Sequence, residues 1–243
     1  MKITYKLYSD IGSRENNEDS LGMLERDGAY CFALADGLGG HGKGEVASAM
    51  AVKTVLKRFE EMPESGDFLD VAFTDAQDEV LLAQRDGHEL ADMKTTMVVL
   101  QLTPEAARWG HIGDSRLYFF QNGKLKSHTP DHSVPQMLVN IGEISEKEIR
   151  FHEDRNRLLR VIGAEWGSHS YDLAPEVTLR AEQVFLLCSD GFWELIEEKQ
   201  MMKELKRASS VEEWMDAMTG IIRDRKDQDD MDNNSAIAVW ITK

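Results

Sequence analysis

The sequence predicts an α+β fold built as a layered sandwich, and three observations support this prediction. Strand-like apolar runs cluster in the middle of the chain instead of alternating regularly with helices, as they would in a wound βαβ sheet. The helical patterns are grouped in two places, directly after residue 43 and again after residue 210. The 243 residues contain no internal repeat, low-complexity tract or linker rich in Pro, Gly or Ser. We therefore expect one domain spanning residues 1–243.

The first third of the chain is predicted to hold two strands and two helices. Ile3, Tyr5 and Leu7 alternate with polar residues, which indicates a half-buried strand. Residues 29–35 form an apolar run that reads as a buried strand ending at Asp36. Helices are expected over 44–61 and about 67–85, because apolar residues recur there at helical spacing: Val46, Ala47, Met50, Ala51, Val55 and Phe59, then Phe68, Ala72, Ala76, Val80 and Ala83.

The middle of the chain is predicted to consist of strands and a polar flap. Asn122-Gly123 is a strong signal for a tight hairpin turn, which would lead into a strand at 124–126. Residues 130–165 are polar and irregular with short helical pieces, and we expect them to form a surface flap. Further strands are predicted at 96–102, 108–112, 116–120, 184–188 and 235–241, and a late amphipathic helix is indicated by Val211, Trp214, Met215, Met218, Ile221 and Ile222.

Composition limits the partners and the compartment. The net charge is −16, which argues against nucleic acid or an anionic membrane as the main partner. The N-terminus has no apolar signal core, and no run approaches the length of a membrane span, so we expect a cytoplasmic protein. Cys31 and Cys188 both lie in apolar runs and are expected to be buried, reduced side chains.

Four short segments containing aspartate are spread along the chain and carry most of the functional information. Three of them follow or precede an apolar run, so carboxylates from distant parts of the chain are expected at strand ends. Hard divalent cations prefer oxygen ligands, and one or two carboxylates plus waters suit Mg²⁺ or Mn²⁺. A pair of such ions can activate water near neutral pH and clamp a phosphoryl group. The segments are Asn17-Glu18-Asp19, Ala35-Asp36-Gly37-Leu38-Gly39-Gly40, Ser189-Asp190-Gly191 and Asp232-Asn233.

Each segment alone also fits a simpler explanation. The stretch from Gly12 to Asp19 reads equally as a charged surface turn, and an Asp-Gly pair is an ordinary turn signal. Adjacent Glu18 and Asp19 point to opposite faces of an extended strand, so only one of them is expected to face an ion directly. Arg14 is a forked donor suited to two oxygens of a phosphoryl group.

Taken together, these segments resemble the metal-dependent protein phosphatase family of the 2C type, and its compact bacterial branch in particular. Any one block is weak evidence, whereas the order and spacing of the blocks are highly specific. The resemblance runs through nearly the whole chain and rests on Gly12-Ser13-Arg14, Glu18-Asp19, Ala35-Asp36-Gly37-Leu38-Gly39-Gly40-His41, Thr95-Thr96, Ile112-Gly113-Asp114-Ser115-Arg116, Asp131-His132-Ser133, Ser189-Asp190-Gly191 and Asp232-Asn233.

The resemblance implies a central antiparallel β-sandwich flanked by helices, an α-β-β-α arrangement, with a binuclear metal centre at one end. Asp36 would bridge two tightly bound Mn²⁺ or Mg²⁺ ions. The Gly37 carbonyl would complete the shell of one ion, and Asp190 and Asp232 would hold the other.

The same resemblance implies roles for the remaining site residues. Glu18 would act largely through a metal-bound water, with Asp19 as its neighbour in the outer shell. Arg14 would bind the substrate phosphate. A third, weaker ion would have Asp114 and Asp190 as ligands, and the flap at 130–165 would lie beside the active site.

Two positions depart from the pattern of the family. Some members place His directly after the Asp-Gly pair as a candidate proton donor, whereas this chain has Leu38, and His41 follows three residues later. Lys94 precedes Thr95-Thr96 where the family usually has Gly. A lysine there is expected to lie in solvent outside the inner metal shell, with a contact to a carboxylate or a phosphate as the alternative.

The implied reaction is hydrolysis of phosphoserine or phosphothreonine in proteins by a hydroxide that bridges the two ions. The implied partners are phosphorylated proteins and a cognate bacterial Ser/Thr kinase, with the enzyme itself a monomer. A non-catalytic interaction domain is the first alternative, although all four acidic segments are intact. A binuclear nuclease is the second, and the negative charge disfavours it. Cys31 and Cys188 lack the glycine-and-arginine loop of a cysteine phosphatase.

Overall fold

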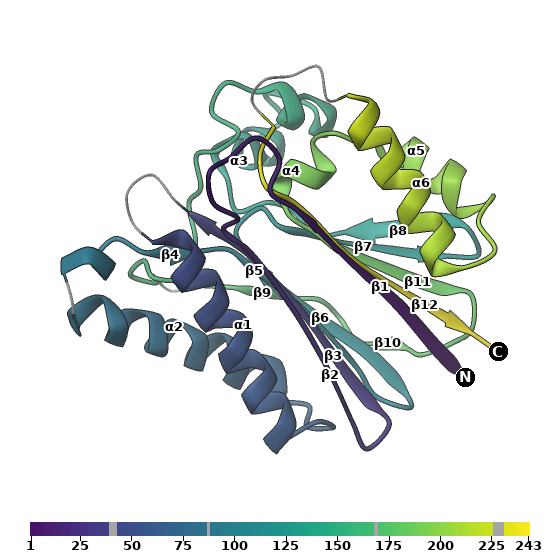
Figure 1. Ribbon diagram of the computed structural model, residues 1–243, viewed down its shortest axis with the longest axis horizontal. Coiled ribbons are helices and arrows are strands. Elements are labelled where there is room, and N and C mark those ends of the chain that lie inside the picture. The colour runs from purple at the N-terminus through teal and green to yellow at the C-terminus, as the bar shows by residue number, and fades with distance from the viewer. Residues whose placement is uncertain (39–42, 87, 168–169, 226–230) are drawn as a thin grey trace.

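Two antiparallel β-sheets pack face to face, and helices cover both outer faces (Figure 1). The computed structural model describes residues 1–38, 43–86, 88–167, 170–225 and 231–243. The arrangement confirms the predicted α+β sandwich with its α-β-β-α layers. Within the described residues, no helix combines the length and the apolar character that crossing a lipid bilayer requires.

The first sheet contains the two terminal strands and has the order β1-β12-β11-β7-β8. Its strands are β1 (Lys2–Asp10), β12 (Asn234–Thr242), β11 (Gln183–Cys188), β7 (Arg116–Gln121) and β8 (Lys124–His128). The pairing of Lys2 with Thr242 places the two ends of the chain side by side (Figure 1).

The second sheet has the order β10-β6-β5-β3-β2, with β4 paired to β3 and β9 paired to β6. Its strands are β10 (Val177–Thr178), β6 (Ala106–Ile112), β5 (Met97–Leu102), β3 (Ala29–Leu38), β2 (Asp19–Arg26), β4 (Lys94–Thr95) and β9 (Asp172–Leu173). The ends of the longer predicted strands agree with these bounds to within two residues, except that β1 and β3 each end three residues later than predicted.

Three apolar layers hold the sandwich together. On β3, Phe32 and Leu34 face the layer between the sheets, whereas Cys31, Ala33 and Ala35 face the helices on the outside. Both faces of the strand are therefore buried, which explains its continuous apolar run. Full burial of a residue such as Phe or Leu contributes about 1.5–3 kcal/mol.

Helices α1 (Gly44–Glu61) and α2 (Phe68–Asp86) cover the second sheet and confirm the two predicted helices. The α1 helix approaches β2 closely at Gly22, where a Cβ atom would lie 2.6 Å from Val52 and 2.7 Å from Leu56. The strand β2 was not predicted. Its signal is the Asp27-Gly28 pair, whose φ values of 54° and 81° fit a tight hairpin turn into β3.

Three helices cover the first sheet on the opposite side: α4 (Asp190–Trp193), α5 (Glu198–Leu205) and α6 (Val211–Asp224). The α6 helix confirms the predicted late helix. Ser210 is its N-cap residue, and the Ser210 hydroxyl accepts a hydrogen bond from the Glu213 amide. Its Trp214 packs edge-on against Phe120 of β7. The short helices α4 and α5 were not predicted.

The flap predicted at residues 130–165 contains α3 (Val134–Asn140) and the 3₁₀ helix η2 (Glu146–Phe151). A further 3₁₀ helix, η1 (His88–Leu90), follows α2. Two isolated bridges fasten the flap region, one between Ser133 and Leu158 within it and one between Ile162 and Thr95 of β4.

Candidate metal centre

A cavity of about 700 Å³ opens at the end of the sandwich where β3 and β11 end and β2 and β12 begin. The flap contributes one wall, through residues such as Asn156 and Leu158. Lys94, which is half-buried, lines the cavity as well. His41 lies outside the described residues. The predicted site residues that line the cavity are Arg14, Glu18, Asp36, Gly37, Asp114, Asp190 and Asp232.

The β2–β3 hairpin positions the first carboxylates. Asp19, at the start of β2, is paired directly opposite Asp36 near the end of β3. The Gly37 amide donates to the Glu18 carbonyl at 3.0 Å. The Asp36 carbonyl accepts hydrogen bonds from the Thr96 amide and the Thr95 hydroxyl, both at 2.8 Å. The backbone around Asp36 is thus held from two neighbouring strands.

Close backbone contacts explain two of the glycines in the motifs. A Cβ atom at Gly37 would overlap the carbonyl of Gly44 at the start of α1. A Cβ atom at Gly191 would overlap the carbonyl of Asn233 and lie 3.2 Å from the Asp232 Cβ. The two glycines therefore allow α1 and α4 to approach the strand ends that carry the aspartates.

Ser189 joins three segments beneath the cavity. Its hydroxyl donates to Asp19 Oδ2 at 2.9 Å and accepts a hydrogen bond from the Ser235 amide at 3.0 Å. The next residue, Asp190, begins α4. Asp19 is 8% exposed and does not line the cavity.

The converging carboxyl groups disfavour one another's ionised forms. Burial is the largest cause that raises the pKa of Asp36 well above its ordinary value, and the charges of Asp19, Asp190, Asp114 and Asp232 raise it further. Burial also raises the pKa of Asp190 to about 7 and that of Asp19 to about 6. A hydrogen bond between the Asp36 and Asp190 side chains opposes part of the rise at Asp190. Carboxyl groups this close must share either protons or a cation.

This donor set fits hard divalent cations. The groups that line the cavity offer carboxylate and carbonyl oxygens, which Mg²⁺ and Mn²⁺ prefer. Asp19 Oδ1 is buried and has no hydrogen-bond partner among the described residues, so it has spare capacity to accept from a water in a metal shell. The residues present therefore match the binuclear centre that the sequence predicts.

Arg14 lies beside the acidic groups and contacts one of them directly. Its Nε and Nη2 atoms donate to Asp232 Oδ1 and Oδ2, each at 3.0 Å, so the pair is bidentate. Both side chains are close to half-exposed. The Asn233 side chain holds the loop that carries Arg14. Its Nδ2 donates to the carbonyls of Ile11 and Asn16, and its Oδ1 accepts a hydrogen bond from the Glu18 backbone amide. This structural role of Asn233 was not predicted.

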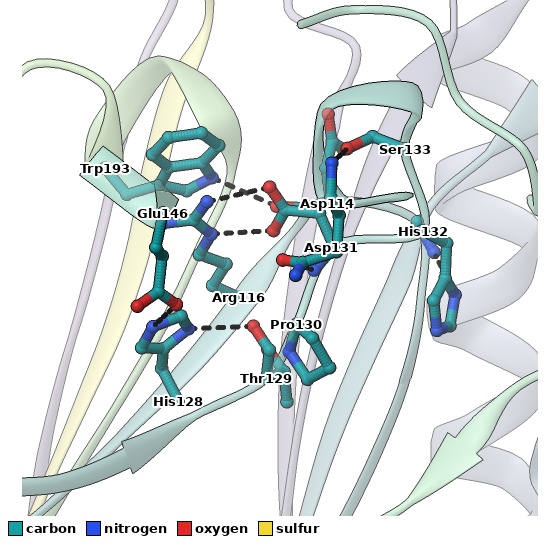
Figure 2. Close-up of polar contacts among 12 residues, drawn as sticks. Asp114, Arg116, His128, Thr129, Pro130, Asp131, His132, Ser133, Glu146 and Trp193 are labelled. Carbon is teal, nitrogen blue, oxygen red and sulfur yellow. Dashed lines mark hydrogen bonds and ion pairs between the residues drawn. The ribbon is translucent and has the colours of Figure 1, made fainter. Parts of the chain in front are cut away.

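Asp114 lies in the turn between β6 and β7, and a buried network supports that turn (Figure 2). The Trp193 indole donates to the Asp114 carbonyl at 3.0 Å. Arg116, two residues further on, forms a bidentate pair with Asp131 at 2.7 Å and stacks over the Trp193 ring at 3.5 Å. These supporting contacts were not predicted, although Arg116, Asp131 and His132 belong to the quoted motifs.

A second group of possible metal ligands lies behind this turn. Nitrogen or oxygen atoms of His111, His132 and Asp172 all lie within 4.8 Å of one another. The Gly113 amide donates to His132 Nδ1, so the proton of the neutral ring is on Nε2, which donates to Asp172 at 3.0 Å. A metal bound at Nε2 would require the ring proton to be on Nδ1, and Nδ1 could then no longer accept the hydrogen bond from the Gly113 amide. This group is therefore better explained as a hydrogen-bonded support for the Asp114 turn.

The neutral state of His132 agrees with its surroundings, because burial lowers the pKa of His132 to about 4. His128 points to the other side of the segment and contacts Glu146 (Figure 2). His128 is the last residue of β8.

Comparison with known proteins agrees with this geometry. The chain is 33% identical over 210 residues to the serine/threonine phosphatase stp of Listeria monocytogenes, covering 84% of this chain and 82% of the relative. It superimposes on the crystal structure of the Mycobacterium tuberculosis serine/threonine phosphatase PstP/Ppp with a TM-score of 0.85, 29% identity and 99% coverage of both chains. A structure of the PstP catalytic domain in complex with two manganese ions matches with a TM-score of 0.82 and 28% identity, covering 99% of each chain.

An acidic, oxygen-lined centre at the end of an α-β-β-α sandwich defines the class of metal-dependent phosphatases. The family model described as Protein phosphatase 2C matches residues 8–234. The chain belongs to the protein phosphatase 2C family.

Proposed function

We propose that this protein is a metal-dependent phosphatase that hydrolyses phosphoserine and phosphothreonine in proteins. The observation that carries the proposal is the convergence of Asp36, Asp190, Asp232 and Arg14 in the lining of one cavity. Divalent ions, when bound, supply an activated water and neutralise charge on the phosphoryl oxygens.

Five residues of the chain would bind the two ions and one of their waters. Asp36 would contact both ions, with the Gly37 carbonyl on one of them and Asp190 and Asp232 on the other. Glu18 would hold a water of the metal shell. These positions rest on the convergence of the groups in one cavity and on the raised pKa values of Asp36 and Asp190.

The remaining groups would handle the substrate and the outer shell. Arg14 would receive two phosphoryl oxygens through the guanidinium edge that contacts Asp232 in this structure. Asp19 would orient a shell water through its unpartnered Oδ1. Asp114, which lines the same cavity, would hold a third and weaker ion together with Asp190.

The identity of the ions and the partners are part of the proposal. Mn²⁺ and Mg²⁺ both suit an all-oxygen site, and the two-manganese structure of PstP supports Mn²⁺ as the first ion to test. The substrates would be phosphorylated proteins in the cytoplasm, modified by a bacterial Ser/Thr kinase, and the enzyme would act as a monomer. A net charge of −16 supports protein over nucleic acid as substrate.

The test is release of phosphate from a phosphothreonine peptide by the purified chain, with manganese added or chelated. The expected result is turnover that requires the metal, with no cleavage of a nucleic-acid substrate under the same conditions. Cleavage of the nucleic acid alone would instead identify a nuclease. Metal binding without any turnover would identify a non-catalytic member of the family.

A further inference from the structure

A second cavity of about 670 Å³ lies on the other side of the Asp114 turn, between the edge strand β8, the flap helix η2 and the start of α5. We call it the β8 pocket. Its volume falls in the range of small-molecule sites, roughly 300–1,000 Å³. The residues that matter for its chemistry are Arg116, Lys126, Lys147, Arg150, Phe151 and Trp193.

The inner wall of the β8 pocket is built from buried charged and aromatic groups. The side chains of Arg116 and Arg150 are 4% and 10% exposed. Arg116 is held between Asp131 and the Trp193 ring (Figure 2), and Arg150 donates to the Trp193 and Ile196 carbonyls. These groups are already ordered, so a ligand would not have to fix them on binding.

The rim of the β8 pocket carries positive charge that lacks a counter-ion. Within the part of the chain that the structure describes, neither Lys126 nor Lys147 has an ion-pair partner, and both are exposed. The wall also carries three carboxylates, and each contacts another wall residue: Glu146 contacts His128 at 2.7 Å, Glu197 contacts Lys199 at 2.7 Å and Glu198 contacts Arg150 at 3.0 Å. Glu197 and Glu198 are thus paired with cations, and the two rim lysines outnumber the remaining carboxylate, Glu146, so the pocket is a locally cationic site on an acidic protein.

Phe151, at the end of η2, gives the same rim an apolar surface. It is 82% exposed, the most exposed of the large hydrophobic side chains described. A flat ring that covered it would remove apolar area from water on both partners. A ligand whose ring packs on Phe151 and whose anionic group contacts the two lysines would be an aromatic anion.

The wall of the β8 pocket is covalently continuous with the metal centre through two short elements. The α4 helix carries Asp190 at its first position and Trp193 three residues later. The β6–β7 turn carries Asp114, and β7 begins with Arg116. The hydrogen bond from the Trp193 indole to the Asp114 carbonyl closes this connection at 3.0 Å. Trp193 and Arg116 are therefore each connected by a short stretch of chain to a residue that lines the metal cavity.

We propose that the β8 pocket binds a small aromatic anion and that its occupation alters metal binding at Asp114 and Asp190. The anionic group would lie between Lys126 and Lys147, and the ring would pack on Phe151. The binding site does not depend on the proposed phosphatase activity, and only the coupling refers to the metal residues.

The test of the site is a nuclear magnetic resonance titration of the ¹⁵N-labelled full chain with 1-naphthoate, following the assigned indole N–H of Trp193. We expect a saturable shift, with at least about tenfold weaker binding to the Lys126→Glu, Lys147→Glu double variant, because two attractive contacts become repulsive. Lys124→Glu is the matched control, since Lys124 is exposed on β8 and does not line the pocket. Neutral 1-naphthalenemethanol should bind at least about tenfold more weakly. Equal affinity of the wild type and the double variant would overturn the site.

The coupling is tested by a Mg²⁺ titration of the same sample with and without saturating 1-naphthoate, following the Asp114 and Asp190 amide signals. A coupling in the usual range changes the half-saturating Mg²⁺ concentration by at least about fivefold. An unchanged concentration would overturn the coupling. Neither readout uses turnover, so an inactive protein would refute the proposed function and leave this test valid.

Discussion

Replacing Asp36 with Asn is the sharpest test of the metal centre. The Asp36 side chain lines the cavity and keeps its shape in the variant, but it loses the charge that would hold two cations. In the presence of chelator, the variant should be at least as stable as the wild type, because the charges of Asp19, Asp190, Asp114 and Asp232 all oppose ionisation of Asp36. With metal, the order of stability should reverse.

The size of this reversal follows from linkage. An ion present at a hundred times its dissociation constant stabilises the folded state by about 2.7 kcal/mol, so two such ions contribute about 5 kcal/mol. For a chain of this length, 1 kcal/mol corresponds to about 2–4 °C in Tm. The wild type should therefore gain about 10–20 °C on metal saturation, and Asp36→Asn should gain little. Turnover should fall at least about a thousandfold, as when preorganised electrostatic stabilisation is removed elsewhere.

The measurements are thermal unfolding with and without manganese, bound metal per chain, and phosphopeptide turnover. Asp78→Asn is the matched control, since Asp78 is exposed on α2 and does not line the cavity. Two bound ions, a full metal-induced rise in Tm and near-normal turnover in Asp36→Asn would refute the bridging role.

Three further outcomes are expected. Arg14→Ala should raise KM for a phosphopeptide about tenfold or more and leave the metal content unchanged; a loss of metal would show instead that Arg14 mainly supports Asp232. Asp114→Ala should keep two tight ions and lose the activation of turnover at high metal concentration, so superimposable metal titrations would exclude the third site. In the metal-free protein, the pKa values of Asp19, about 6, and Asp190, about 7, are higher than in the unfolded chain. As the pH rises, the unfolded chain therefore loses these protons at a lower pH than the folded protein does. Stability should therefore be highest below pH 4 for these groups and fall, by about 3 kcal/mol at most for Asp19, as pH rises to about 7. Metal-free Tm values that stay flat from pH 5 to 8 would contradict this.

The sequence predicted best where one physical pattern dominated. The helix α1 is buried along one face and was located by its helical periodicity, whereas β11 is buried throughout and was located by its continuous apolar run, both to within one residue. The aspartate segments were predicted to converge, and each of the four contributes at least one residue to the lining of the cavity. Short polar segments with weak periodicity were missed. The strand β2 has Gly22 in its middle because α1 packs there, a tertiary contact that no local pattern contains.

The contacts that hold the site in place could not be predicted from the sequence either. Arg116 and Asp131 are 15 residues apart, and nothing in their local sequence indicates a buried bidentate pair. The same holds for Asn233, which connects three distant backbone groups through one side chain. Such partners are determined by chain topology, whereas the carboxylates of the cavity could be found in the sequence because turn residues and apolar runs surround them.

The position of β12 between β1 and β11 has a consequence for synthesis. The strand β1 is synthesised before the other strands of the two sheets, and it pairs with β12, which is synthesised after them. The early part of the chain can fold into the second sheet with α1 and α2 while β1 still has no neighbour in its own sheet. Arg14 can meet Asp232 only after β12 has been inserted. A chain that still lacks β12 should therefore remain inert toward phosphoproteins, and it becomes competent in a single late step that orders β1 and β12 together.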